Sequence, residues 1–171
     1  MRELTTERLR LRAFTDDDLD FVHELHTHPG IARLIPKQVA TDRAAALAQT
    51  RRFQTLAEHP VHGFYCATLR AAGTPVAMIM CKPIPASAGV PLDDVEIGWR
   101  QHPYHGGRWY ASEAAAAVLA HALASGLPRV VAVTDPENTA SMRICERIGM
   151  THRGRTRDYY DAECELFVAD Q

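Results

Sequence analysis

The sequence has no long apolar run, few cysteines and no strong excess of charge, and each lack excludes a class of protein. No stretch approaches the ~18 apolar residues of a membrane-spanning helix, and the N-terminal MRELTTERLRLRAF lacks the apolar core of a signal peptide. The formal net charge of −2 gives no case for nucleic acid or an anionic membrane as a partner. The four cysteines are scattered without a CxxC pair, so neither a disulfide framework nor a zinc ribbon is expected. We therefore expect a cytoplasmic protein in a reducing compartment.

What is present is typical of an ordinary globular protein. Hydrophobic residues make up 46% and charged residues 23% of the chain, enough apolar surface for a core and enough charge for solubility. A length of 171 residues fits one domain, and no repeat or linker-like tract divides it. We expect a single domain over residues 1–171.

The hydrophobic pattern predicts a mixed α/β (α+β) fold. Alternation over residues 8–14 predicts a strand, and Thr15 with the acidic residues after it predicts a helix start. HPGIARLIP, residues 28–36, is a loop or a broken helix. Further helices are predicted at 41–56, 110–125 and 138–149, and further strands at 62–69, 75–82, 94–101, 129–134, 150–157 and 160–168. This order predicts a mixed central sheet of about six to seven strands with helices on both faces.

The segment HPYHGGRWYASEA, residues 102–114, combines two glycines with the start of an alanine-rich helix. A helix N-terminus carries unpaired N–H groups and partial positive charge, so the segment predicts an anion-binding turn, with phosphate as the usual ligand. The spacing fits neither a dinucleotide fingerprint nor a P-loop. His102 and His105 lie three apart, but nothing nearby completes a metal site, and we expect no metal.

Two polar residues stand on otherwise apolar patterns. In DDVEIGWRQ, Val95, Ile97 and Trp99 point to one face of the strand, and Glu96 and Gly98 to the other. Glu96 is either a solvated edge residue or a carboxylate beside the anion-binding turn. Asn138 is predicted to cap the helix that begins there. Ser141 in that helix shares a face with Ile144, Cys145 and Ile148, and is either bonded to its own helix or aimed at a pocket.

Several segments together resemble a known family. LTTERLRLRAFTDDDLDFVHEL, VEIGW, HPYHGGRWYASEA, NTASMRICERIGM and RDYYDAECELFVAD occur in the order and at distances similar to those of the GNAT N-acetyltransferases. The branch resembled is that of the ribosomal-protein N-terminal (RimJ/RimL-type) acetyltransferases. The resemblance covers nearly the whole chain. It implies acetyl transfer from acetyl-CoA to an amine by direct attack in a ternary complex.

The resemblance also implies a site. The strand before the glycine loop would splay from residues 129–134, and the cofactor would occupy the gap. The implied catalytic residues are Glu96, as the base, and Ser141, beside the leaving sulfur; Asp158 is a second candidate base. The implied cofactor-binding residues are Ile97, Gly98, Trp99, Gln101, Gly107, Arg108, Trp109, Tyr110, Ala111, Ser112 and Asn138.

One departure from the family pattern concerns the phosphate turn. The family motif usually reads like HWGRGYATEA, whereas this chain has HGGRWYASEA, so Trp109 replaces the second glycine. A helix start needs only negative φ, which tryptophan adopts readily, so we expect Trp109 to turn away from the phosphates. The alternative to an acetyltransferase is a non-catalytic or vestigial module that binds CoA or acyl-CoA. For the enzyme, we expect the acceptor to be a protein or peptide N-terminus or a small amine. We expect the chain to be a monomer or homodimer.

Overall fold

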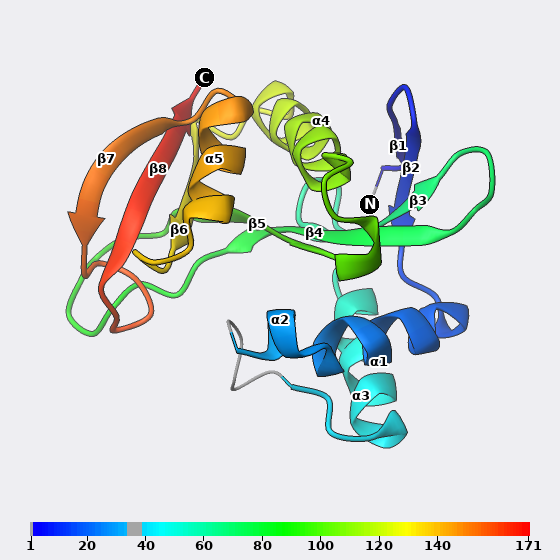
Figure 1. Ribbon diagram of the computed structural model, residues 1–171. Helices are drawn as coiled ribbons and strands as arrows, with labels where there is room; N and C mark the ends of the chain where they lie inside the picture. The colour runs from blue at the N-terminus through cyan, green and yellow to red at the C-terminus, as the bar shows by residue number, and fades with distance from the viewer. Residues whose placement is uncertain (1, 34–38) are drawn as a thin grey trace.

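The computed structural model describes residues 2–33 and 39–171 as one sheet with helices on both sides (Figure 1). The described elements up to residue 124 are, in chain order, β1 (Leu4–Thr5), β2 (Leu9–Ala13), α1 (Leu19–Thr27), α2 (Pro29–Ala32), α3 (Arg43–Gln54), β3 (Gly63–Leu69), β4 (Pro75–Pro83), β5 (Val95–Gln101) and α4 (Tyr110–Ala124). The chain continues with β6 (Arg129–Thr134), α5 (Thr139–Arg147), β7 (Thr151–Thr156) and β8 (Cys164–Asp170). The 3₁₀ turns η1 (Asp16–Asp18) and η3 (Pro103–His105) precede α1 and α4.

The sheet has the order β1-β2-β3-β4-β5-β6-β8-β7. Its described neighbours pair antiparallel, except β5 and β6, which run parallel. The predicted mixed α/β fold is confirmed. The sheet has eight strands rather than six to seven, because the two-residue β1, too short to give a period, adds an edge to β2.

Alternation along the central strands divides the core between the two faces of the sheet. On one face Val95 and Ile97 pack with Val118 of α4, as the alternation in β5 predicts. On the other face Met78 packs with Phe53 of α3 and Phe21 of α1. Figure 1 shows α4 and α5 on one side of the sheet and α1, α2 and α3 on the other. The residues of β5 therefore face two different environments, which decides what Glu96 can contact.

The sheet opens in its middle. β4 and β5 are paired from Pro83–Val95 to Ala77–Gln101, whereas the parallel β5 and β6 are paired at Glu96 and Val131 alone. Beyond Glu96, the edge of β5 that faces β6 has no strand partner among residues 2–33 and 39–171. The expected splayed strands are therefore present, and the gap lies immediately before the glycine loop.

The segment predicted as a loop or broken helix contains the short helix α2 (Pro29–Ala32), which fits a broken helix, and residues 34–36 of that segment lie outside the described residues. The strand predicted over residues 160–168 differs from the structure. The last strand begins at Cys164 rather than at residue 160. Tyr160 and Asp161 have φ of 60° and 52°, left-handed values that end strand pairing there and make a turn.

Candidate active site

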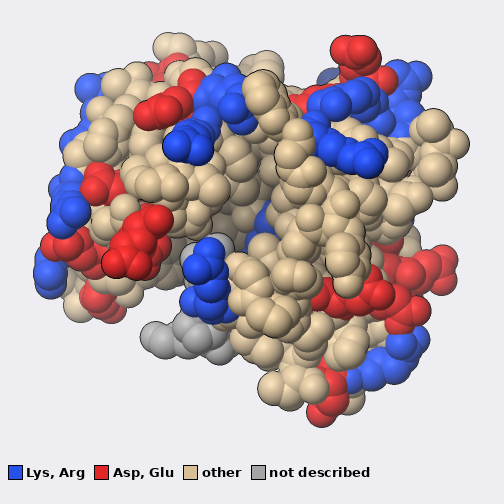
Figure 2. All heavy atoms as spheres, viewed as in Figure 1, with Lys and Arg blue, Asp and Glu red and all other residues tan. Residues whose placement is uncertain are grey.

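A cavity of about 560 Å³ lies at the gap between β5 and β6. Its walls come from β5, β6, the start of α5, Ile31 of α2 and the turn between β7 and β8. Eight of the predicted site residues line it: Glu96, Ile97, Gly98, Trp99, Gln101, Ala111, Asn138 and Ser141. Figure 2 shows the front face hollowed between the two halves of the molecule, with basic side chains at the hollow. The fold thus gathers residues from three separate segments of the sequence.

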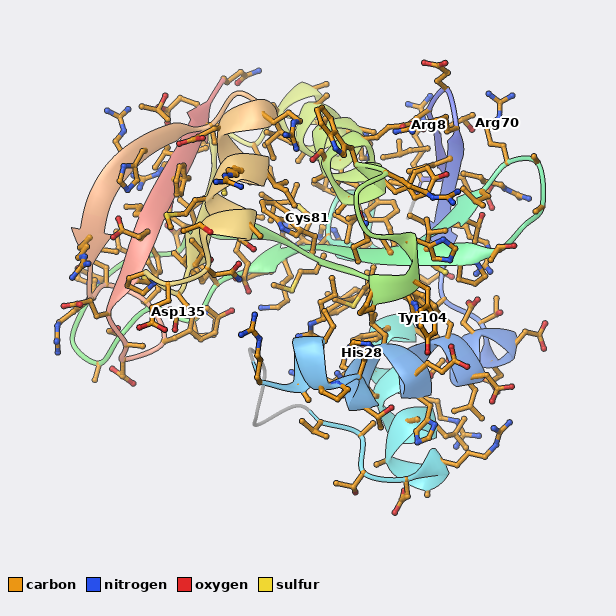
Figure 3. The ribbon with its side chains drawn as sticks, viewed as in Figure 1. Arg8, His28, Arg70, Cys81, Tyr104 and Asp135 are labelled. Carbon is orange, nitrogen blue, oxygen red and sulfur yellow. The ribbon has the colours of Figure 1, made fainter. Side chains whose placement is uncertain are left out.

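The remaining predicted residues lie at the start of α4. Gly107, Arg108, Trp109 and Tyr110 line a neighbouring hollow of about 480 Å³ together with Arg8. Arg8 lies over the Tyr110 ring, 4.8 Å from its centroid, and pairs with Glu113 of α4 at 2.6 Å. Figure 3 places Arg8 between β2 and α4. The N-terminus of α4 therefore opens toward a basic surface, which suits an anion.

Gln101 fastens the end of β5 to this turn. Its side-chain amide donates to the carbonyl of His105 at 2.6 Å, and its carbonyl oxygen accepts from the N–H of Ala111 at 2.8 Å. The N–H of Ala111 is therefore already bonded, which corrects its place in the predicted cradle of phosphate donors. The physical reason is that an amide at the strand end can satisfy one of the orphan donors of the helix start.

Trp109 adopts a conformation that we did not predict. Its φ is 64° and its ψ is 20°, in the left-handed region, so the expectation of negative φ is wrong. This is the region that glycine enters without cost, which explains why the family places glycine here. The side chain is 57% exposed, and the guanidinium of Arg147 lies over the ring at 3.9 Å from its centroid. Arg147 also donates to the hydroxyl of Ser112 at 3.1 Å, so this contact joins α5 to the start of α4.

Glu96 is buried rather than solvated. Its side chain has 3% exposure and is contacted by two neighbours, the ammonium of Lys82 and the hydroxyl of Tyr160, which both donate to Oε1. Lys82 lies directly opposite Glu96 in the β4–β5 register. Tyr160 comes from the turn between β7 and β8. The solvated-edge interpretation is therefore wrong, because the face of β5 that carries Glu96 turns toward the cavity.

Ser141 and Asn138 stand at the opposite wall, on the first turn of α5. The side-chain oxygen of Asn138 accepts from the N–H of Ser141 at 3.2 Å and caps the helix, as the sequence predicted. Both side chains line the cavity. Asp135, labelled in Figure 3 at the end of β6, braces the loop before them by accepting from the N–H of Glu137 at 2.8 Å.

The side of the cavity opposite α4 contains a second half-buried cation. Arg100 lines the cavity and donates to Nε2 of His26, a fully buried side chain of α1. Burial, together with the charge of Arg52, lowers the pKa of Arg100 to about 10. Met80 lies beside Gly98, where a Cβ would be 2.4 Å from its terminal methyl group. Glycine at 98 thus leaves room for Met80 at the floor of the cavity.

The second candidate base, Asp158, lies outside the cavity. Its backbone carbonyl accepts from the N–H of Ser87 at 2.7 Å, and its own N–H donates to the hydroxyl of Thr156 at 3.1 Å. Asp158 therefore holds the turn, which matches its interpretation as a turn residue.

Sequence reasoning did not assign Lys82, Arg100, Gln101 as a brace, or Arg147. Lys82 and Arg100 lie near the motif residues Glu96 and Gly98 in the folded chain. The strand register, rather than the sequence of either segment, brings Lys82 there. One signal was available: Arg100 is two positions from Gly98, and hence on the same face as Glu96. In the part of the chain that the structure describes, no group of three or more histidine, cysteine or acidic side chains is arranged to hold a metal. Nor, in that part, is any helix long and apolar enough to cross a membrane.

Comparisons with known proteins agree on one family. A family model described as an acetyltransferase (GNAT) domain matches residues 8–151. A Bacillus subtilis (strain 168) protein named an uncharacterized N-acetyltransferase, YnaD, is 29% identical over 153 residues, which are 88% of this chain and 84% of that protein. A crystal structure of a GNAT-family acetyltransferase from Bacillus anthracis has a TM-score of 0.81 and 25% identity, covering 99% of this chain and 98% of that one.

A further structure shares the fold alone. It is the ribosomal L7/L12 alpha-N-protein acetyltransferase RimL in complex with coenzyme A, with a TM-score of 0.79 and 16% identity, covering 99% of this chain and 98% of that one.

Proposed function

The chain belongs to the GNAT family of acetyltransferases, and from this we propose that it acetylates a primary amine by direct attack in a ternary complex with acetyl-CoA. The observation that carries the proposal is the cavity at the β5–β6 gap. It has Glu96 on one wall and Ser141 on the other, and it lies next to the N-terminus of a long helix. A non-catalytic module that binds CoA is the alternative.

The residues present fit acetyl-CoA. The cavity volume of about 560 Å³ lies within the range of small-ligand sites. The unpaired edge of β5 offers backbone groups to an extended, amide-containing arm, and the start of α4 offers N–H groups and Arg108 to phosphate oxygens. When bound, acetyl-CoA supplies an activated acetyl thioester. Trp109 keeps the left-handed backbone of the turn, which supports a retained phosphate site rather than a vestigial one.

Each side chain is assigned one task. Glu96 accepts a proton from the acceptor ammonium, because only the neutral amine is nucleophilic. A backbone N–H near Ile97 or Gly98 donates to the carbonyl oxygen as negative charge develops there. The hydroxyl of Ser141 donates a hydrogen bond toward the leaving sulfur. The nitrogen loses a second proton when the amide forms, and the thiolate sulfur takes up that proton. Asn138 fixes the helix turn that presents Ser141.

The acceptor is a protein or peptide N-terminus or a small amine. The RimL structure is titled as an alpha-N-protein acetyltransferase, and that name supports, for this chain, the first of the two. The compartment we propose is the cytoplasm, supported by four cysteines that are all buried and free.

The experiment compares Glu96→Gln with Asp158→Asn, a matched loss of one carboxylate outside the cavity. Thiol release from acetyl-CoA is followed with a panel of peptides bearing free N-termini and of small primary amines, and acetyl-CoA binding by calorimetry. We expect Glu96→Gln to lower kcat by on the order of 10²- to 10⁴-fold with little change in Kd, and Asp158→Asn to retain activity. Full activity of Glu96→Gln would overturn the assignment of the base. Tight acetyl-CoA binding without transfer to any amine would favour the non-catalytic alternative.

A further inference from the structure

Glu96 stands in a small polar cluster, and the other members of this cluster have no task in the reaction described above. Oε1 accepts from Lys82 on β4 and from the hydroxyl of Tyr160 in the β7–β8 turn. Lys82 and the Tyr160 hydroxyl are also 3.4 Å apart. The other ionisable groups that interact with this carboxylate are Cys81 on β4 and Arg100 on β5. A buried carboxylate with two charged or polar partners of its own is a built arrangement rather than an incidental one.

The position of Tyr160 depends on an unusual backbone. Tyr160 and Asp161 are consecutive non-glycine residues at positive φ, a conformation that costs roughly 1–2 kcal/mol per residue. Hydrogen bonds to the loop between β4 and β5 hold them there. The N–H of Tyr160 donates to Pro85 at 3.1 Å, and the N–H of Asp161 to the hydroxyl of Ser87 at 2.9 Å. The carboxylate of Asp161 in turn accepts from the N–H of Ala88 at 2.8 Å. Strain that its surroundings maintain in this way points to a function of the strained residue.

The cluster also spans the distance from the buried site to the surface. Glu96 is 2% exposed, whereas Tyr160 is 45% exposed. A buried base that takes a proton from each acceptor ammonium must lose that proton to solvent before the next turnover. Of the two residues that donate to Glu96, Tyr160 is the exposed one, whereas the Lys82 side chain is only 20% exposed. Burial and the neighbouring carboxylate raise the pKa of Tyr160, so the hydroxyl stays protonated and acts as a donor and relay rather than as an anion.

We propose that Lys82 and Tyr160 are positioning residues for Glu96, with both holding its Oε1 by hydrogen bonds and Tyr160 relaying its proton to water. The inference rests on the proposed function of Glu96. The proton balance closes: the ammonium nitrogen loses one proton to Glu96, the Tyr160 hydroxyl then rotates so that its own proton points to water, and its oxygen accepts the proton of Glu96 as it releases its own to water. One proton leaves per turnover, and each residue returns to its starting state.

The test uses Tyr160→Phe, which keeps the ring, with Tyr104→Phe as the matched control, since Tyr104 is 81% exposed and contacts His28 instead (Figure 3). We expect Tyr160→Phe to lower kcat about 10- to 100-fold, with acetyl-CoA affinity and Tm close to those of the parent, and Tyr104→Phe to change none of them. In a double-mutant cycle, Tyr160→Phe should cost little once Glu96→Gln is present, because both act on one proton transfer. Equal losses in the two backgrounds would overturn the relay.

Lys82 is tested by the split between kcat and Kd. Lys82→Met removes the ammonium that holds the carboxylate of Glu96, so kcat should fall on the order of tenfold with the Kd for acetyl-CoA close to that of the parent. Lys82→Arg, which keeps a charged donor, should restore most of kcat. Equal losses of kcat in Lys82→Met and Lys82→Arg, or an undiminished loss when Glu96→Gln is already present, would show a structural role only and overturn this part of the inference. Absence of acetyl transfer by the parent protein would instead refute the proposed function, so the two failures are distinguishable.

Discussion

The histidine buried beneath the cavity should make this protein acid-sensitive. His26 on α1 is 0% exposed; its Nδ1–H donates to the carbonyl of Val22 at 2.8 Å, and its Nε2 accepts from Arg100. Both bonds fit the neutral ring, since Nε2 is an acceptor only when unprotonated. Burial and, second, the charge of Arg100 lower the pKa of His26 from 6.5 to about 4. The Phe53 ring covers it from α3, at 5.8 Å between centroids.

The sign of the effect follows from proton linkage. Below pH 6.5 the unfolded chain protonates this histidine, while the folded chain resists protonation until about pH 4. The free energy of unfolding therefore falls as pH decreases through this window and is unaffected above it. With 1.36 kcal/mol for each pH unit between the two pKa values, the loss is about 1 kcal/mol at pH 5.5 and about 3 kcal/mol by pH 4.

The assay compares the parent with His26→Gln by urea unfolding at pH 7.5, 6.5, 5.5 and 4.5. Glutamine can donate to Val22 and accept from Arg100 without titrating, so other ionisable groups cancel in the difference. The stability of the parent relative to the variant should be constant above pH 7 and should fall by about 1 kcal/mol at pH 5.5. A difference that is independent of pH, or that rises on acidification, would refute the reasoning.

Three further outcomes are expected. Trp109→Gly should change the Kd for acetyl-CoA less than tenfold by calorimetry, and should change Tm by only a few degrees, because relief of roughly 1–2 kcal/mol of backbone strain opposes the loss of roughly 0.5–1 kcal/mol of stacking on Arg147. A larger affinity change would place the indole in the phosphate site. Ser141→Ala should lower kcat about 10- to 100-fold in the thiol-release assay with Kd nearly unchanged; an unaltered rate would leave Ser141 a packing residue. Gln101→Leu should lower the free energy of unfolding by about 1–3 kcal/mol in urea, because it leaves the Ala111 N–H unpaired; full stability would show that water replaces the amide.

Local patterns were sufficient for much of the fold. The alternation in residues 95–99 predicted that Val95, Ile97 and Trp99 share one face of the strand. Val95 and Ile97 belong to the core cluster that contains residues of α4, and Trp99 packs against it. Asn138 was predicted to cap α5, and it does. These predictions succeeded because each depends on neighbours within a few residues, where periodicity and capping operate.

The environment of Glu96 could not be predicted in the same way. Lys82 faces it because of the β4–β5 register, which sets Lys82 opposite Glu96 and is not encoded by either segment alone. Tyr160 reaches it from a turn that the sequence read as a strand, since alternating apolar residues there gave no sign of positive φ. The resemblance to the family identified a carboxylate at this position, but not the groups that hold it.

The turn before α4, which we propose binds phosphate, has the left-handed backbone conformation although Trp109 stands where the family usually has glycine. Gly106, where the family usually has tryptophan, has a φ of −56°, which any residue can adopt. A Cβ at this position would, however, lie only 3.1 Å from the carbonyl oxygen of Pro103. Trp109, at φ of 64°, stands where glycine would be free of strain. The exchange therefore relieves crowding at one position and adds strain at the other. The stack of Arg147 on the indole, and its bond to Ser112, tie the strained residue to two helices, so the turn keeps its left-handed entry into α4 and with it the donors that an anion requires.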